Sequence, residues 1–285
     1  MHTVSALSAP RPPRQSVVIQ PRRRPFDLDL RLLWSYRELL YFLVWRDVKI
    51  RYKQTAIGAA WAVLQPAITM VIFSIVFTYF VRVPSDGLPY PLFVFAALVP
   101  WTYFAQAVTR TSISLVGDAA LVRKVFFPRV LVPLSAAAVP MVDLAFGCLA
   151  LVALMAWYRV APTWGILALP LLLLLAFLSA LAVGLYCAAL NVRYRDVGYA
   201  IPFLVQAAMY ASPVVYSVSL VPERWRALYS LNPMAGVIEG FRWALLGKAS
   251  PDFQVMLLSA GVVLVVLLSG LVVFSRMERT FADII

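Results

Sequence analysis

The side chains that could support acid–base, nucleophilic or metal chemistry are few in this sequence. The single histidine is His2, and the two cysteines, Cys148 and Cys187, both lie inside apolar runs. A zinc site needs about four convergent ligands, and an enzyme site needs a nucleophile or an acid–base pair in one place. The sequence therefore predicts no catalytic residues and no metal site. It argues against a membrane-embedded glycosyltransferase or acyltransferase.

Asp143 is the one charged residue inside the long apolar runs described below. A bare carboxylate at membrane depth is expensive, so such residues have partners or line functional paths. Asp143 fits three roles: a structural hydrogen-bonding hub, a partner for a basic residue, or part of a proton path. The residues alone leave these three roles open.

The sequence lacks the pattern of a nucleotide-binding loop. A P-loop reads G-x-x-x-x-G-K-[ST], because its amides cradle phosphate while its lysine and hydroxyl reach phosphate and Mg²⁺. The nearest string is Gly240 followed by Gly247-Lys248-Ala249, where the spacing is too long and the last residue has no hydroxyl. An ATP-driven activity would therefore need ATP and Mg²⁺ on a separate polypeptide.

Composition indicates the environment of these side chains. Hydrophobic residues make up 62% of the 285 residues, charged residues make up 13%, and the mean hydropathy is +0.84. A soluble domain is about half apolar and about a quarter charged. A membrane-spanning helix needs about 20 mostly apolar residues. Six runs qualify: 56–81, 88–109, 130–158, 160–190, 198–219 and 253–275. We therefore expect an all-α integral membrane protein with six transmembrane helices.

The net charge of +12 fits either nucleic-acid binding or membrane topology, and the distribution of charge decides between them. With the N-terminus inside, 19 of the 25 Lys and Arg residues lie in the tail and loops that would be cytoplasmic. This asymmetry follows the positive-inside rule. It favours two cytoplasmic termini and argues against a nucleic-acid partner. Residues 1–28, rich in Pro and Arg, are predicted to be a disordered basic tail, and 29–285 the membrane domain.

The segment 31–47 precedes the first apolar run. Its apolar residues recur at helical spacing, with Arg31, Ser35 and Glu38 opposite them, and Asp29 is a candidate N-cap. The segment is too short and too charged to span a membrane. It is predicted to be an amphipathic helix at the cytoplasmic interface.

Two further patterns predict structure on the cytoplasmic side and inside the bundle. The loop 112–133 should contain a short helix that Pro128 helps to end. Ala180, Gly184 and Ala188 recur every four residues within the fourth run. Small residues at this spacing allow helices to pack closely in lipid.

The segment 228–246, on the outer side, is apolar but interrupted by Asn232-Pro233. It also carries Glu239 and Arg242, which are spaced to pair on one helix face. Such a segment does not cross lipid as one helix. A re-entrant helix pair that is buried in protein is the predicted solution.

Four stretches together resemble one family. They are Arg46-Asp47 with Arg51-Tyr52-Lys53-Gln54-Thr55, Gly58, Trp61 and Gln65-Pro66; then 121–129 (LVRKVFFPR); then 191–197 (NVRYRDV); and Leu231-Asn232-Pro233-Met234 with Glu239 and Arg242. In this order they are similar to the permease, or transmembrane, subunit of ABC polysaccharide exporters of the O-antigen and teichoic acid type. The resemblance extends from about residue 27 to the C-terminus.

The resemblance implies a homodimeric pore in the bacterial inner membrane, flanked by two ATP-binding cassette subunits. The chain would translocate a lipid-linked polysaccharide of O-antigen type and would not itself be an enzyme. The family's interface helix maps onto 31–47, its coupling helix onto 112–127 and its re-entrant helices onto 228–246. Because ATP makes a proton path unnecessary, a structural role for Asp143 is favoured.

Four groups of candidate site residues follow from these assignments. The ATPase-coupling group is Asp118, Leu121, Arg123, Lys124, Phe126, Pro128 and Arg129, whose charges positive-inside topology also explains. Residues at the inner mouth that could attract lipid phosphate or pyrophosphate are Arg46, Lys49, Arg51 and Lys53. The outer gate group is Asn232, Pro233, Glu239 and Arg242.

The fourth group is aromatic, because sugar faces stack on aromatic rings without requiring one register. The candidates for a glycan pathway are Phe73, Phe77, Tyr79, Phe80, Tyr90, Trp101, Tyr103, Phe104, Tyr210 and Tyr216. Membrane-interface belts of Tyr and Trp are the alternative interpretation. Teichoic acid, capsule, drug and lipid cargoes stay open beside O-antigen. An ion-coupled transporter would need more intramembrane carboxylates and an internal repeat.

Overall fold

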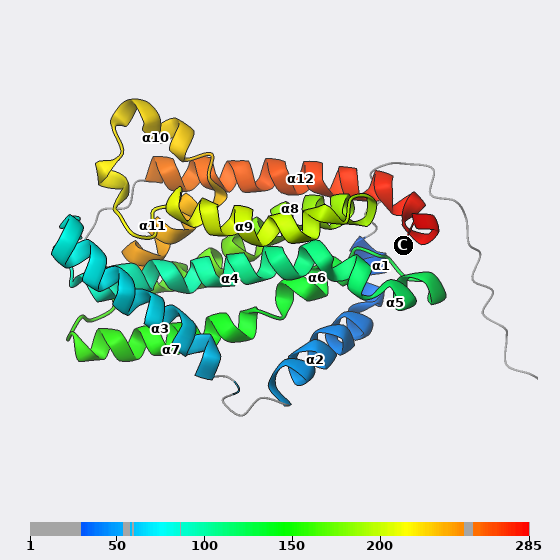
Figure 1. Cartoon of the computed structure of the whole chain (residues 1–285), viewed down its shortest axis with the longest axis horizontal. Helices are drawn as coiled ribbons and strands as arrows, with labels where there is room; N and C mark the ends of the chain where they lie inside the picture. Colours follow the sequence, from blue (N-terminus) through cyan, green and yellow to red (C-terminus); the bar gives the residue numbers. More distant parts are fainter. Residues whose placement is uncertain (1–29, 54–57, 59, 86, 248–252, 285) are drawn as a thin grey trace, which may run out of the picture.

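The computed structural model describes residues 30–53, 58, 60–85, 87–247 and 253–284. All regular elements in this part of the chain are helices, which run side by side in one elongated bundle (Figure 1). The all-α class is therefore confirmed. The tail 1–28, the candidate N-cap Asp29 and Lys248 lie outside the described residues.

Among the described residues, five helical segments are long and apolar enough to cross a membrane. They are α3 with the π-helix η1 (Ala60–Ile75, Val76–Val81), α4 (Tyr90–Gly117), α6 with α7 (Leu131–Ala138, Met141–Trp157), the 3-10 helix η2 with α8 (Trp164–Ala168, Leu169–Arg193), and α12 (Phe253–Ile284). These segments match the first four predicted runs and the last one. The count of six spans is not confirmed.

The predicted fifth run, 198–219, has a different structure. Helix α9 (Asp196–Tyr210) is 15 residues long, and turns follow it over 211–216. Proline lacks the N–H that a helix needs and disfavours the helical conformation of the residue before it, so Ser212-Pro213 ends the helix. At 1.5 Å per residue α9 covers about 22 Å, less than a hydrocarbon core of about 30 Å.

The third span is also interrupted. Its two parts, α6 and α7, are separated by a turn at Val139-Pro140. The proline ring has no N–H and clashes with the preceding turn of the helix. The break places Asp143 in the first turn of α7, whereas the sequence suggested the middle of one continuous span.

Helix α4 is the buried axis of the bundle, and α8 packs along it. Ala180 and Ala188 on α8 are fully buried, and a Cβ built on Gly184 would lie 2.6 Å from Cγ2 of Thr111 on α4. The stripe of small residues therefore packs two helices together, as its spacing predicts.

Short helices occupy the two ends of the bundle. Helices α1 (Leu30–Ser35), α2 (Arg37–Lys53) and α5 (Ala119–Lys124) lie toward the end where α12 finishes (Figure 1). The 3-10 helix η3 (Val218–Leu220) and α10 (Glu223–Tyr229) lie at the opposite end, and α11 (Pro233–Leu246) is buried against α4, α8 and α12. Both described ends of the chain therefore lie at the same end of the bundle.

Replacing Gly184 with leucine should destabilise the protein. The new side chain would occupy space that Thr111 fills, and overpacking typically costs about 1–3 kcal/mol. The matched control is Gly261→Leu on α12, where a Cβ would meet no atom within 4 Å. Thermal unfolding of the detergent-solubilised protein measures the difference. Equal melting temperatures for the two variants would contradict the close packing of α4 on α8.

Candidate functional site

The loop between α4 and α6, residues 118–130, is fixed at its first residue. Both carboxylate oxygens of Asp118 accept hydrogen bonds from Nη2 of Arg46 on α2, at 3.0 and 3.1 Å. Arg46 also donates from Nε to Asp47, at 2.8 Å. Burial alone would lower the pKa of Arg46, but the hydrogen bond to Asp47 and the charge of Asp118 raise it. The start of the loop is therefore tied to α2 by a charged contact.

The 118–130 loop is fixed at its other end as well. The backbone N–H of Arg129 donates to Oε1 of Glu278 on α12, at 3.1 Å, and its guanidinium donates to the Glu278 carbonyl. Phe127 and Pro128, which precede Arg129, are buried. Two residues assigned to ATPase coupling, Asp118 and Arg129, are therefore engaged within this chain.

Between these two contacts, the tip of the loop is exposed. Arg123 and Lys124 end α5 with exposed side chains, and Phe126 is 70% exposed. Leu121 is half-buried and packs on the core beneath the loop. An exposed aromatic ring beside two cations is suited to docking against another protein, because aromatic anchors dominate many interfaces.

One face of helix α2 lies against the bundle, and residues on this face bind the side chain of Asp143. The Asp143 carboxylate, 6% exposed, forms an ion pair with Arg51 and accepts a hydrogen bond from the Tyr52 hydroxyl. Arg51 also donates to Oε1 of Gln106 on α4, at 2.8 Å. Burial and the bond to Asp143 raise the pKa of Tyr52 to about 12. Asp143 is thus both the partner of a basic residue and a hub between α2, α4 and α7.

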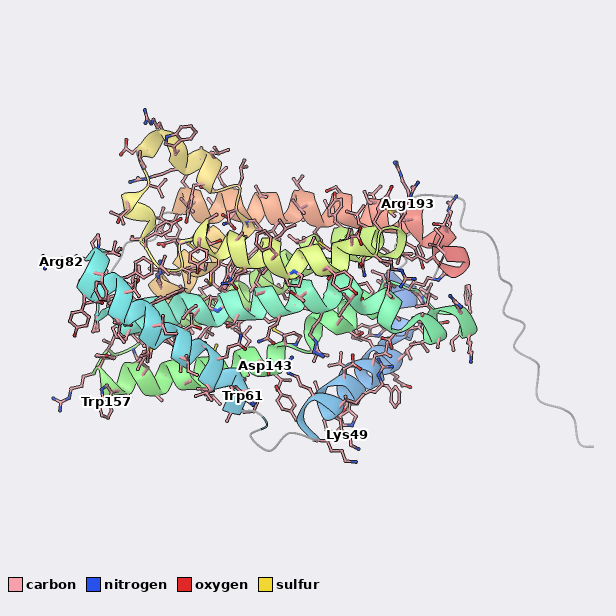
Figure 2. The ribbon with its side chains drawn as sticks, in the orientation of Figure 1. Lys49, Trp61, Arg82, Asp143, Trp157 and Arg193 are labelled. Atoms are coloured by element: carbon pink, nitrogen blue, oxygen red, sulfur yellow. The ribbon has the colours of Figure 1, made fainter. Side chains whose placement is uncertain are left out.

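The opposite face of α2 is exposed. Phe42, Trp45 and Ile50 lie there beside Lys49 and Lys53, and Lys49 points away from the bundle (Figure 2). A concave region of about 410 Å³ follows this face. The four residues assigned to the inner mouth therefore divide into two kinds. Arg46 and Arg51 form ion pairs toward the bundle, whereas Lys49 and Lys53 face outward.

The ten aromatic residues assigned to a glycan pathway also divide by burial. Tyr90, Trp101, Tyr103 and Phe104 are core residues of α4, and Phe73, Phe77 and Tyr216 are half-buried. The Tyr90 hydroxyl donates to the Val215 carbonyl at 2.8 Å, as expected of a structural tyrosine. Tyr79, Phe80 and Tyr210 are exposed. Only these last three lie fully at the surface of a single copy.

Sequence reasoning missed an exposed stripe on α9. Tyr199, Phe203, Gln206 and Tyr210 recur at helical spacing along one side of the helix, and all four are exposed. The signal was present in the run 198–219, since these positions are separated by four, three and four residues. Of the four, only Tyr210 was assigned to the pathway.

The outer gate residues form a connected cluster at the other end of the bundle. Arg242, only 5% exposed, pairs with Glu239 at 3.2 Å, as the three-residue spacing predicts. Its guanidinium also donates to the carbonyls of Val214, Phe93 and Tyr216 and lies 3.6 Å from the centroid of the Phe93 ring. Arg242 therefore holds α11 against α4 and the turns that follow α9.

Asn232 and Pro233 begin α11. The Asn232 side chain accepts from the N–H of Met234 at 2.9 Å and donates to the Ser212 hydroxyl at 2.8 Å. Pro233 at the first helical position is compatible with a helix start. The Tyr229 hydroxyl donates to that of Tyr216 at 3.1 Å, and burial raises the pKa of Tyr229. Because the Tyr216 carbonyl also accepts from Arg242, a residue assigned to the glycan pathway is in direct contact with one assigned to the outer gate.

The described residues 30–53, 58, 60–85, 87–247 and 253–284 contain no group of three or more His, Cys, Asp or Glu side chains arranged to hold a metal ion. The ion pairs Arg46–Asp118 and Arg51–Asp143 join α2 to the 118–130 loop and to α7. What this arrangement offers is an exposed, anchored loop at one end and a polar, tyrosine-rich cluster at the other.

The chain matches one protein family and is similar to several individual proteins. A family described as ABC-2 type transporter matches residues 38–246. The O-antigen export system permease protein RfbA of Klebsiella pneumoniae is 28% identical over 255 residues, covering 87% of this chain and 95% of its own length. The protein of the same name in Myxococcus xanthus is 28% identical over 257 residues, covering 89% and 98%. The polysialic acid transport protein KpsM of Escherichia coli is 22% identical over 240 residues, covering 82% and 91%.

Removing the carboxylate in Asp143→Leu should destabilise the protein by about 3 kcal/mol, because breaking a buried ion pair leaves Arg51 without its counter-charge. The double variant Arg51→Met with Asp143→Leu should recover most of this loss, since it removes both charges. Melting temperatures of the two single variants and the double variant complete the cycle. A double variant less stable than either single variant would show that the pair is not coupled as described.

Proposed function

Since this chain belongs to the ABC-2 type transporter family, we propose that it is the membrane-spanning subunit of an ATP-driven exporter of lipid-linked polysaccharide of O-antigen type. The observation that carries this proposal is the likeness to two O-antigen export permeases over nearly the full length of all three chains. Export of capsule-like polymers is the second candidate, favoured by the weaker likeness to the polysialic acid transport protein.

ATP hydrolysis would take place on two separate ATP-binding cassette subunits, which hold the ATP and Mg²⁺. The tip of the 118–130 loop is their proposed docking element on this chain. Three features support this assignment: Phe126 is exposed, Arg123 and Lys124 flank it, and Asp118 and Arg129 anchor the loop on either side. An anchored loop can transmit a displacement, whereas a loose one would absorb it.

We also propose six membrane crossings with both termini in the cytoplasm of a bacterial inner membrane. In Figure 1 the segments α3, α4, α6–α7, α8, α9 and α12 run alternately toward one end of the bundle and the other. Helix α9 and the turns after it would form the fifth crossing. The α10–α11 pair would be the re-entrant segment on the outer side, and α11 is buried as such a segment requires.

The proposed orientation is consistent with residues at the two ends. Arg82 and Trp157 lie at the end that would face outward, and Arg193 lies toward the other end (Figure 2). Helix α2 would lie at the cytoplasmic surface, its exposed aromatic residues at the interface and Lys49 and Lys53 near lipid phosphates. The pyrophosphate of the proposed cargo is also an anion, so the same two lysines could attract it.

The glycan pathway is proposed to follow α9 and to be closed by a second copy of this chain. Gln206 is exposed in the second half of α9, a helix that would be at membrane depth. A polar side chain there avoids lipid and faces protein or a water-filled cavity. The aromatic rings of Tyr199, Phe203 and Tyr210 share its face and are suited to stacking on sugars.

The exposed Tyr79 and Phe80 and the half-buried Phe73, Phe77 and Tyr216 are proposed to extend this pathway. Tyr90, Trp101, Tyr103 and Phe104 are left out, since contact with a glycan would require α4 to lose its packing.

Purification of the tagged chain from native membranes should recover a P-loop ATPase, and Phe126→Ala should reduce that recovery about tenfold. A buried aromatic anchor at an interface commonly contributes more than 1.4 kcal/mol, which corresponds to a factor of about ten. Trp164→Ala, which removes another exposed ring on η2, is the matched control and should recover the ATPase normally. If the unmodified chain recovers no ATPase, the proposed function is wrong.

Tyr210→Ala with Gln206→Leu should lower surface glycan while the lipid-linked precursor accumulates on the cytoplasmic side. The reason is that the pathway would lose one ring and its polar group. Leu257→Ala, on the exposed aliphatic face of α12, is the control. Immunoblots of surface glycan and of the lipid-linked pool provide the measurement. Normal export by the α9 variant would exclude this face from the pathway.

A further inference from the structure

Helix α12 joins the two ends of the bundle. It runs without interruption from Phe253 to Ile284, 32 residues, or about 48 Å at 1.5 Å per residue. In Figure 1 it extends from the neighbourhood of α10 to the end where α1 and α5 lie. A single helix therefore passes beside both the 118–130 loop and the cluster of outer gate residues.

The end of α12 near its C-terminus holds the 118–130 loop through polar and apolar contacts. Glu278 receives both the backbone N–H and the guanidinium of Arg129. Phe274 and Phe281 are buried, their ring centroids 5.3 Å apart, in one cluster with Phe127 of the loop. A displacement of the loop near Arg129 must therefore move this part of α12 or break these contacts.

The beginning of α12 holds residues 230–236, which are the connection between α10 and α11 together with the first turn of α11 and are called the 230–236 turn below. The Ser259 hydroxyl, fully buried, is within hydrogen-bond distance of the Ser230 and Asn232 carbonyls, at 3.0 and 3.2 Å, and accepts from the N–H of Gly236 at 3.2 Å. A Cβ on Gly236 would lie 2.8 Å from that of Ser259. The 230–236 turn is thus in direct contact with α12, with no room for another side chain between them.

Between its two ends α12 packs along α8. A Cβ on Gly270 would lie 3.1 Å from the Tyr186 ring and 3.3 Å from the Ala182 carbonyl. Closely packed helices shift by small sliding movements of whole elements instead of deforming continuously. Movement of α12 along α8 would therefore carry Glu278 and Ser259 together.

We infer that α12 couples the 118–130 loop to the 230–236 turn, so that a movement imposed on the loop is delivered to the opposite end of the protein, with Glu278 and Ser259 as positioning residues of the transport cycle. The inference rests on the proposed function, because the movement comes from an ATPase docked on the loop. Neither residue touches cargo. Glu278 fixes α12 to the loop that moves it, and Ser259 fixes α12 to the turn that it moves.

The test uses the complex of this chain with its ATPase, in the variants Ser259→Ala and Glu278→Ala. The matched control is Ser269→Ala on the same helix, whose hydroxyl donates to the carbonyls of Val265 and Val266 within α12. Three quantities are measured: ATP hydrolysis, glycan export, and the distance between spin labels at Ala227→Cys on α10 and Trp157→Cys on α7, with Cys148 and Cys187 replaced by alanine.

Ser259→Ala is expected to keep ATP hydrolysis near the wild-type rate and to reduce export about fivefold or more. A reduction of this size corresponds to losing the free energy of about one hydrogen bond between α12 and the 230–236 turn. The ATP-dependent change in label distance should be present in the parent and in Ser269→Ala but lost in Ser259→Ala. Glu278→Ala, at the other end of the helix, should also lose it. Agreement of two variants so far apart is not what a local packing defect would produce.

Two outcomes would overturn the inference. If Ser259→Ala and Glu278→Ala match Ser269→Ala in export and label distance, α12 does not carry the coupling. If the unmodified chain recruits no ATPase, the proposed function fails and the inference fails with it. These failures are distinguishable, because the second is seen without any substitution. Should Ser259→Ala fail to fold, Glu278→Ala, which is not fully buried, decides the question alone.

Discussion

A polar group at membrane depth must find its partner inside the protein, and most features of this chain follow from that constraint. Backbone groups are paired within helices, and hydroxyls such as those of Thr109 and Ser179 donate to the carbonyl four residues earlier in their own helix. Charged groups need partners as well, on their own helix or on neighbouring segments. The Arg242 guanidinium donates to three backbone carbonyls and forms an ion pair with a carboxylate. The Asp143 carboxylate forms an ion pair with Arg51 and accepts a hydrogen bond from Tyr52. The same requirement that satisfies these groups thus fixes how the helices are arranged.

The sequence could predict those features that depend on local pattern. Apolar length located five spans, Asn232-Pro233 located the start of α11, and the three-residue spacing of Glu239 and Arg242 gave their ion pair. The repeat of Ala180, Gly184 and Ala188 gave the contact with α4. In each case the determining residues are neighbours within one helix, so their geometry is set by 3.6 residues per turn.

Features that depend on tertiary contacts were beyond the sequence. Arg46 and Asp118 are 72 residues apart, and Tyr52 and Asp143 are 91 apart, so no spacing rule joins them. The burial of the α4 aromatics was equally hidden, because a ring in a core and a ring in a pathway have the same local signature. The length of α9 was overestimated for another reason. Hydropathy counts Pro213 as part of an apolar run, whereas the backbone ends the helix before it.

The anchoring of the 118–130 loop bears directly on the mechanical role proposed for it. Helix α5 has six residues, and an isolated helix of that length is unstable in water. Its shape is therefore imposed from outside, by Arg46 on α2 at one end and by Glu278 on α12 at the other. If an ATPase docks on the exposed Phe126 as proposed, its force has two paths into the bundle, one through Arg46 and one through Glu278. On this proposal, weakening either anchor would leave the tip able to bind the ATPase while removing one of the two contacts through which it moves the helices.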